Sequence, residues 1–155
     1  MGDAIAATLM KLRDFKDENF AKFHPGGSLG RRLLTTVESV MKKENLPKSD
    51  KNANIKEIIQ TITNGKCGLV VVADDDKIEG IITDGDIRRA MEINQDKFFT
   101  LTASDLMSTN PKTIQSSEKL VVASEMMSNS KINSLLVTNE NNTLVGIIQM
   151  YDLGI

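Results

Sequence analysis

The sequence predicts an α/β (α+β) fold in which one βαββα unit occurs twice. The main observation is an internal repeat, because the Gly-Ile-Ile triplet at 80–82 recurs 66 residues later at 146–148. In the same register, Val-Met at 40–41 is matched by Leu-Met at 106–107, and the apolar run at 68–71 by the run at 134–137. Several matching blocks in one register indicate a duplicated supersecondary unit.

The second observation is the order of apolar patterns within each copy. In the first copy, Asn54 is expected to cap a helix that ends at Asn64-Gly65. The apolar face of this helix is formed by Ile55, Ile58, Ile59 and Ile62. The continuous β-branched run that follows is typical of a strand buried on both faces. The further elements expected in this copy are strands at 68–73 and 77–83, a turn at 74–76 and a helix at 86–93, with Ile87, Ala90 and Met91 on one side.

The second copy repeats this order and divides the chain into three parts. Its expected elements are a helix at 118–127, strands at 133–138 and 143–149, and a turn at 139–142. The chain ends almost where the last helix would begin, so that helix is expected to be truncated. Residues 35–98 and 99–155 are assigned to the two copies. Residues 1–34 lie outside the repeat and end in a glycine-rich loop.

Composition and charge exclude several classes of function. The net charge is −2 and the basic residues are scattered among acidic ones without forming an extended basic face, so no nucleic-acid partner is expected. No apolar run approaches the length of a membrane span, and no secretory signal is recognised. The single cysteine, Cys67, excludes an internal disulfide and a cysteine-built zinc cluster. We therefore expect a cytoplasmic protein with no metal site and no required cofactor.

The candidate site is a turn that occurs once in each copy. Thr83 and Asp86 follow the strand of the first copy, and Gln149 and Asp152 take the same positions in the second. A helix N-terminus can receive a phosphate and a carboxylate can accept hydrogen bonds from ribose hydroxyls, so the turn suits a nucleotide. Helix capping by Thr83 or Asp84 explains the same residues equally simply.

These motifs resemble the paired CBS domains named after cystathionine β-synthase. The resemblance covers both copies and implies two small sheets that face each other, with ligand sites in the clefts. It also implies that Thr83 contacts a ligand phosphate and that Asp86 and Asp152 contact ribose. Gln149 departs from the family's threonine or serine, so the second site is expected to be altered or empty.

Three strings resemble the arabinose-5-phosphate isomerases, which join a sugar-isomerase (SIS) domain to a CBS pair. They are Gly-Asp-Ala-Ile-Ala at 2–6, His-Pro-Gly-Gly-Ser-Leu-Gly-Arg at 24–31 and Thr-Asp-Gly-Asp-Ile-Arg-Arg at 83–89. The resemblance implies that residues 1–34 are the tail of an SIS domain with its linker. It also implies that His24 is a remnant of the active site of an aldose–ketose isomerase, and that this histidine is not functional alone.

The resemblance further implies a regulatory role in the synthesis of 3-deoxy-octulosonate (Kdo), a sugar of lipopolysaccharide and capsule. The expected effector is AMP, ATP or CMP-Kdo, whose anionic groups Arg88 and Arg89 could reach from the helix. A solvated surface is the alternative for both arginines. The expected partners are the SIS domain and a second CBS pair, in a tetrameric parent. Two rival hypotheses are a structural oligomerisation module that binds no ligand and an isomerase that is active without the SIS fold.

Overall fold

The computed structural model describes residues 33–154, which form two copies of the predicted unit. The first copy contains β1 (Lys48–Ser49), α4 (Ile55–Gly65), β2 (Leu69–Asp74), β3 (Lys77–Thr83) and α5 (Asp84–Asn94). The second contains β5 (Thr113–Gln115), α7 (Leu120–Ser130), β6 (Ser134–Thr138), β7 (Leu144–Gln149) and the 3₁₀ helix η3 (Met150–Leu153). The connecting elements are η1 (Val37–Ser39), η2 (Gln95–Thr100), α6 (Ala103–Leu106) and β4 (Ser108–Thr109).

Helix α4 begins where the sequence predicts. The Asn54 side chain accepts a hydrogen bond from the Glu57 backbone N–H, while the Glu57 carboxylate accepts one from the Asn54 N–H. This reciprocal capping box satisfies two backbone donors that the helix itself leaves free. The predicted apolar face is wrong at one position, because Ile59 is 39% exposed whereas Ile58 is fully buried. A helix face buries a stripe about 100° wide, and Ile59 lies beyond its edge.

Helix α5 begins two residues earlier than the pattern predicts. Thr83 is its N-cap and accepts a hydrogen bond from the Asp86 backbone N–H, so Asp84 and Gly85 already belong to the first turn. Ile87 and Ala90 are buried as expected. Met91 is 50% exposed, so its predicted place on the buried side of the helix is wrong.

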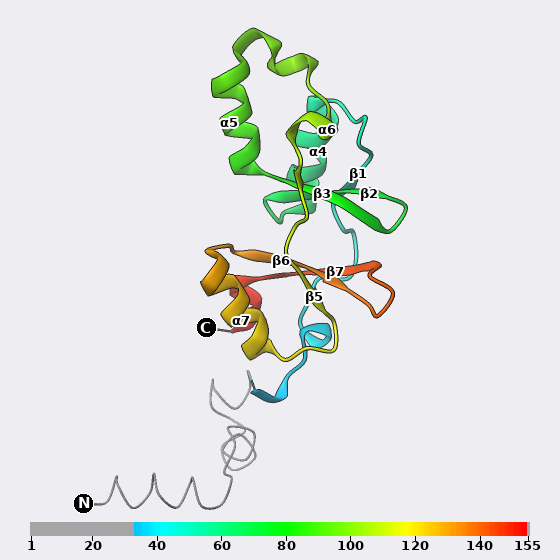
Figure 1. The fold of residues 1–155 in the computed structure, drawn as a ribbon, viewed down its shortest axis with the longest axis vertical. Coiled ribbons are helices and arrows are strands. Elements are labelled where there is room, and N and C mark those ends of the chain that lie inside the picture. The colour runs from blue at the N-terminus through cyan, green and yellow to red at the C-terminus, as the bar shows by residue number, and fades with distance from the viewer. Residues whose placement is uncertain (1–32, 155) are drawn as a thin grey trace, which may run out of the picture.

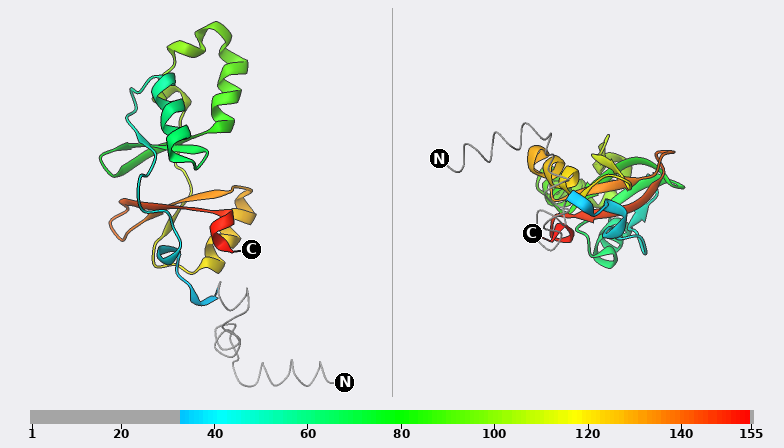
Figure 2. Two further views of the ribbon diagram at one scale, coloured as in Figure 1. Left: turned by 180° about the vertical axis from the view of Figure 1, so that it is seen from behind. Right: turned by 90° about the horizontal axis from the view of Figure 1, so that it is seen from below.

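The two sheets pack face to face at the centre of the molecule, with helices on their outer faces (Figures 1 and 2). Strands β1 to β4 form one sheet and β5 to β7 the other. Leu69 and Val71 of β2 meet Leu136 of β6 and Ile147 of β7 in a shared apolar core. On its other face, β2 packs against α4 and α5. Burial on both faces explains why β2 is a continuous apolar run rather than an alternating one.

Each copy lends its leading segment to the sheet of the other copy. Ser108 of β4 pairs with Ile81 of the first copy, and Lys42 pairs with Ile147 of the second. The two glycines of the repeated triplet allow these crossings. A Cβ atom at Gly80 would lie 2.8 Å from the Met107 sulfur, and one at Gly146 would lie 2.6 Å from the Met41 sulfur. The crossings therefore join the two repeats into one structure.

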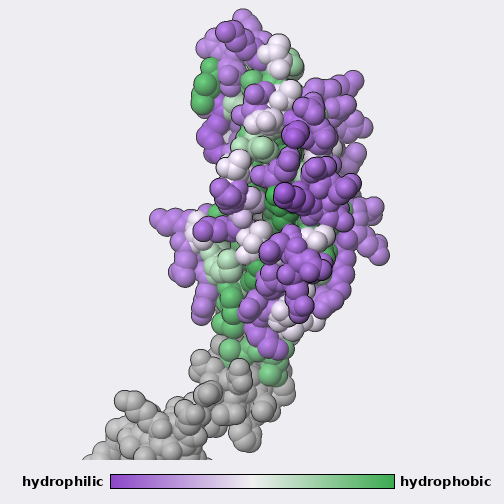
Figure 3. All heavy atoms as spheres, turned by 45° about the vertical axis from the view of Figure 1, so that its right-hand side comes forward, coloured by the Kyte–Doolittle hydropathy of each residue, from purple (hydrophilic) through white to green (hydrophobic). Residues whose placement is uncertain are grey.

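The face of the molecule seen in Figure 3 is largely hydrophilic, with hydrophobic residues gathered in separate places. The large apolar side chains that are exposed are Leu34, Ile59, Met91, Ile93, Phe99 and Tyr151. Among the helices within residues 33–154, none combines the length and the hydropathy needed to cross a bilayer.

Candidate ligand-binding cleft

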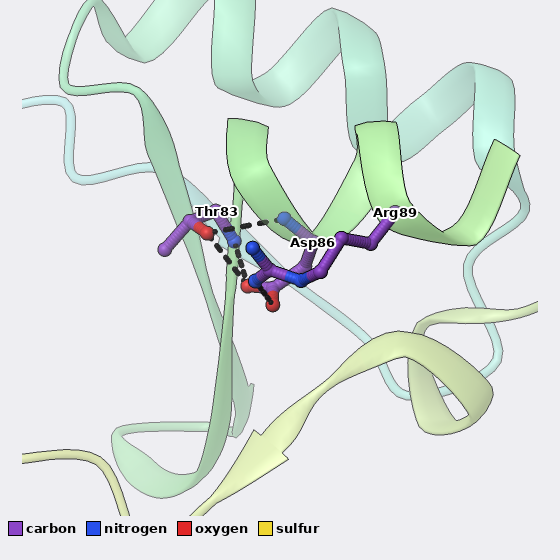
Figure 4. A network of polar contacts seen from close by, with 3 residues as sticks. All are labelled: Thr83, Asp86 and Arg89. Atoms are coloured by element: carbon purple, nitrogen blue, oxygen red, sulfur yellow. Dashed lines mark hydrogen bonds and ion pairs between the residues drawn. The ribbon is translucent and has the colours of Figure 1, made fainter. Parts of the chain in front are cut away.

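Three side chains of the first copy meet where β3 passes into α5 (Figure 4). The Thr83 hydroxyl and backbone N–H donate to the Asp86 Oδ2 atom over 2.7 and 2.8 Å. The Arg89 guanidinium donates to Asp86 Oδ1 over 2.6 Å. One turn of helix places residues 86 and 89 on the same side, so the arginine can reach back to the carboxylate. The arrangement is a compact anion–cation pair at the start of a helix.

The electrostatics keep Asp86 ionised. Partial burial by itself raises the pKa of this carboxyl, but hydrogen bonds from Thr83 and the Arg89 charge together hold the pKa below its ordinary value. The Asp86 side chain is only 17% exposed, whereas that of Arg89 is 66% exposed. Asp86 is thus a fixed acceptor, and Arg89 is a cation with room to move. The capping interpretation of Thr83 is confirmed, while nucleotide contact remains a prediction.

A cleft of about 700 Å³ opens beside this turn, between the two copies. This volume falls within the range of small-molecule sites. Leu69 and Ile81 supply apolar lining, and Thr83 also lines the cleft. Three cationic side chains from different elements, Arg89, Lys112 and Lys131, also line the cleft. An elongated ligand with an apolar ring and anionic groups matches this lining.

The structure brings only part of the predicted site residues to the cleft. Thr83, Arg89 and Gln149 line it, and Asp86 adjoins it through its bonds with Thr83. Arg88 is exposed and is not part of the lining. The Asp152 carboxylate accepts a hydrogen bond from the Gln149 backbone N–H over 2.8 Å.

His24, the predicted remnant of an active site, lies outside the described residues. Among residues 33–154, no three side chains of the types that bind metals gather into a site.

The two lysines of the cleft were missed in the sequence. Lys112 follows β4, which pairs with β3 of the other copy. Lys112 lies near Thr83 only because of this exchange of leading segments between the copies. Lys131 caps the C-terminal end of α7 in the left-handed conformation, with φ of 53°. Its counterpart at the end of α4 is Lys66, which has the same conformation. That recurrence of lysine at both helix ends was the available sequence signal.

The turn of the second copy uses its polar groups differently. The Gln149 amide nitrogen donates to the Cys67 carbonyl over 3.0 Å and to the Ser134 hydroxyl over 3.1 Å. The Tyr151 hydroxyl donates to the Gln149 carbonyl oxygen over 2.6 Å. These contacts leave the glutamine amide with no free hydrogen for a ligand.

Two stacked α+β repeats with a cleft between them define the chain as a tandem pair of small modules. The CBS domain family matches residues 37–93 and 103–153, so this chain belongs to the CBS domain family and contains a tandem pair. The expected fold is thereby confirmed.

The chain is also similar to several arabinose 5-phosphate isomerases. It is 42% identical over 149 residues to a probable arabinose 5-phosphate isomerase of Haemophilus influenzae, covering 96% of this chain and 44% of that protein. It is 41% identical over 153 residues to the arabinose 5-phosphate isomerase KpsF of Escherichia coli, covering 98% of this chain and 46% of that protein. The chain therefore spans less than half the length of these relatives.

Solved CBS structures share the fold. A CBS domain protein from Pyrobaculum aerophilum complexed with AMP superposes with a TM-score of 0.69 at 22% identity, covering 76% of this chain and 89% of that one. A CBS domain pair in complex with 5′-methylthioadenosine and S-adenosyl-L-methionine superposes with a TM-score of 0.68 at 25% identity, covering 77% of this chain and 93% of that one.

Proposed function

We propose that this CBS pair is a regulatory module that binds a nucleotide-type effector in the cleft beside Thr83. The observation that carries the proposal is the combination of a fixed carboxylate, Asp86, with three cationic side chains around an apolar wall. An effector made of a base, a ribose and a phosphate needs an apolar surface for the base, a hydrogen-bond acceptor for the ribose hydroxyls and cations for the phosphate. The adenosine compounds in two similar structures support the ligand class.

The binding geometry follows from the positions of the polar groups. The base lies against Leu69 and Ile81, and the ribose hydroxyls bind Asp86. The phosphate binds the cations, and the Thr83 hydroxyl turns its hydrogen from Asp86 toward the phosphate while the Thr83 backbone N–H keeps its bond with Asp86. Because Arg89 is 66% exposed, its guanidinium can turn from Asp86 toward the phosphate at little cost in buried contacts. Lys112 and Lys131 face the same ligand from the other copy, so binding ties the two repeats together.

The proposed parent is an arabinose-5-phosphate isomerase in which an SIS domain carries the catalysis. Identities of 36–42% to such enzymes over nearly the whole of this chain support this parent. Residues 1–34 would then be the end of the SIS domain and its linker, with His24 as part of its active site. The parent would interconvert ribulose 5-phosphate and arabinose 5-phosphate for Kdo synthesis in the cytoplasm, and CMP-Kdo would act as a feedback effector.

The second candidate function is an oligomerisation module without a ligand. It is favoured by the exposed side chains of Met91, Ile93 and Phe99 at the end of the molecule that carries α5 (Figure 1). A dimer of CBS pairs packed through these helices would cover them, and it would be compatible with a tetrameric parent. Ligand regulation would therefore use the cleft, whereas assembly would use the exposed helices.

Titration of this chain with AMP, ATP and CMP-Kdo separates the two functions. We expect a rise in melting temperature with at least one of them, because a ligand that binds only the folded state stabilises it. The charge reversal Lys112→Glu should abolish this rise, whereas the matched surface change Lys97→Glu, outside the cleft, should not. If folded protein shows no shift with any of the three ligands, the regulatory function is contradicted.

A further inference from the structure

The second turn differs from the first at three equivalent positions. In the 66-residue register, Gln149 replaces Thr83, Tyr151 replaces Gly85, and Ile155 replaces Arg89. Each replacement removes a feature of the anion site. The hydroxyl becomes an amide, the arginine is lost, and a large ring stands where glycine leaves room. A Cβ atom at Gly85 would lie 3.2 Å from an Arg89 guanidinium nitrogen, so the arginine passes close to the glycine.

The Gln149 side chain crosses from the second copy to the first. Its amide nitrogen donates to the carbonyl of Cys67, which lies between α4 and β2 of the first copy, and also to the Ser134 hydroxyl at the start of β6. By contrast, the Thr83 hydroxyl donates to Asp86 within its own copy. The Tyr151 hydroxyl fixes the Gln149 carbonyl oxygen from the solvent side, where the tyrosine is 70% exposed. The amide is therefore held on both of its polar atoms.

We propose that Gln149 and Tyr151 form a latch between the two copies at the position of a second ligand site, and that the chain binds one effector rather than two. The hydrogen bonds of Gln149 with Cys67, Ser134 and Tyr151 support the latch. The claim of single occupancy rests in addition on the proposed function. A phosphate at the second turn would have to displace the amide from Cys67 and Ser134, and it would gain no arginine there in exchange. The part of the cleft beside Thr83 senses the ligand, and the Gln149 turn, which borders the same cleft, holds the repeats together.

Cys67 gives a direct readout of the latch without any ligand. It is the only cysteine of the chain and is 7% exposed, and burial raises the pKa of its thiol, so it should react slowly with the thiol reagent DTNB. Gln149→Thr removes the hydrogen bond from Gln149 to the Cys67 carbonyl. The loss of one such bond should make local opening around Cys67 about tenfold more frequent, so the thiol should be labelled about tenfold faster. The matched control is Gln115→Thr, because Gln115 donates to Thr138 within the second copy only.

Two results decide whether the latch exists. Labelling of Gln149→Thr as slow as that of the wild type and of Gln115→Thr would overturn it. If Gln149→Thr does not fold, Tyr151→Phe takes its place, because it removes only the hydroxyl that holds the amide. That variant should label about two- to threefold faster, in line with a single exposed hydrogen bond. An unchanged rate would again overturn the latch.

Calorimetric titration of this chain with AMP and with CMP-Kdo decides the occupancy. One equivalent per chain is expected, with binding lost in Lys112→Glu. Two equivalents per chain would overturn the claim of a single site. Absence of binding by either ligand would overturn the proposed function together with single occupancy, while the thiol labelling would still decide the latch. The two failures are therefore distinguishable.

Discussion

The turns at Thr83 and Gln149 occupy equivalent places in the two repeats, but they direct their polar groups to different partners. Thr83 bonds with Asp86, which also holds Arg89, and Thr83 and Arg89 line a cleft. Gln149 borders the same cleft, but its side chain bonds with Cys67 of the other copy. The backbone around both turns is the same strand followed by a helical turn. A duplicated fold can thus keep its architecture while the same turn forms different hydrogen bonds in its two copies.

The crossing glycines offer the largest expected effect and test the symmetry of the fold. A Cβ at Gly146 would lie 2.6 Å from the Met41 sulfur and 2.9 Å from the Lys42 backbone oxygen, whereas the three atoms nearest a Cβ at Gly80 all belong to the Met107 side chain. A flexible methionine can yield but backbone cannot. Gly146→Ala should therefore cost about 2–3 kcal/mol of unfolding free energy, and Gly80→Ala about 1 kcal/mol, within the range for overpacking.

Chemical denaturation of both variants measures this difference. Equal losses in the two variants would show that the Lys42 carbonyl can move aside. The two crossings would then be equally tolerant, and the second copy would have no tighter junction than the first.

The adjacent arginines test the cleft itself. Arg89 lines the cleft and pairs with Asp86, so Arg89→Ala should weaken nucleotide affinity about 10- to 100-fold, as expected for a charged hydrogen bond of about 1.5–3 kcal/mol. Arg88 is exposed and outside the lining, so Arg88→Ala should weaken binding less than about threefold, the size of an exposed charge effect. Titration calorimetry on the two variants makes the comparison. A larger loss at Arg88 would reverse the assignment.

Acid should affect the first turn through Asp86. The pKa of Asp86 is lowered in the folded chain, so its hydrogen bonds stabilise the fold above the unfolded pKa of about 3.9, and this contribution is lost as pH falls through the folded value. Between pH 5 and 2, the wild type should thus lose more unfolding free energy than Asp86→Asn, an effect of about 1 kcal/mol or less for this partly exposed turn. Urea denaturation at several pH values measures how the unfolding free energy of each protein changes with pH. The same pH dependence in the wild type and in Asp86→Asn would contradict a stabilising role of the Asp86 carboxylate.

The repeat and the order of elements could be predicted because apolar periodicity and capping residues are local properties. Asn54, Thr83 and the run at 69–72 define their elements through neighbours within a few residues. The crossing of the leading segments could not be predicted, because it depends on pairing between strands far apart in the sequence. Lys112 was missed for the same reason. Its place in the cleft is a property of the whole fold.

The candidate site was predicted in part for a related reason. Thr83 and Asp86 belong to one turn, so the sequence places them together. Gln149 was recognised as a departure from the family, but its hydrogen bond with Cys67 joins residues 82 positions apart in the sequence. A pattern within one turn carries no information about such a partner. The cohesive role of the second turn therefore emerges only from the packed structure.

The most direct test of the central claim is a crystal structure of this chain grown with AMP or CMP-Kdo. One ligand per chain is expected, with its phosphate near Thr83 and Lys112 and its ribose on Asp86, while Gln149 stays bonded to Cys67. A ligand at the Gln149 turn with the cleft beside Thr83 unfilled would contradict the account.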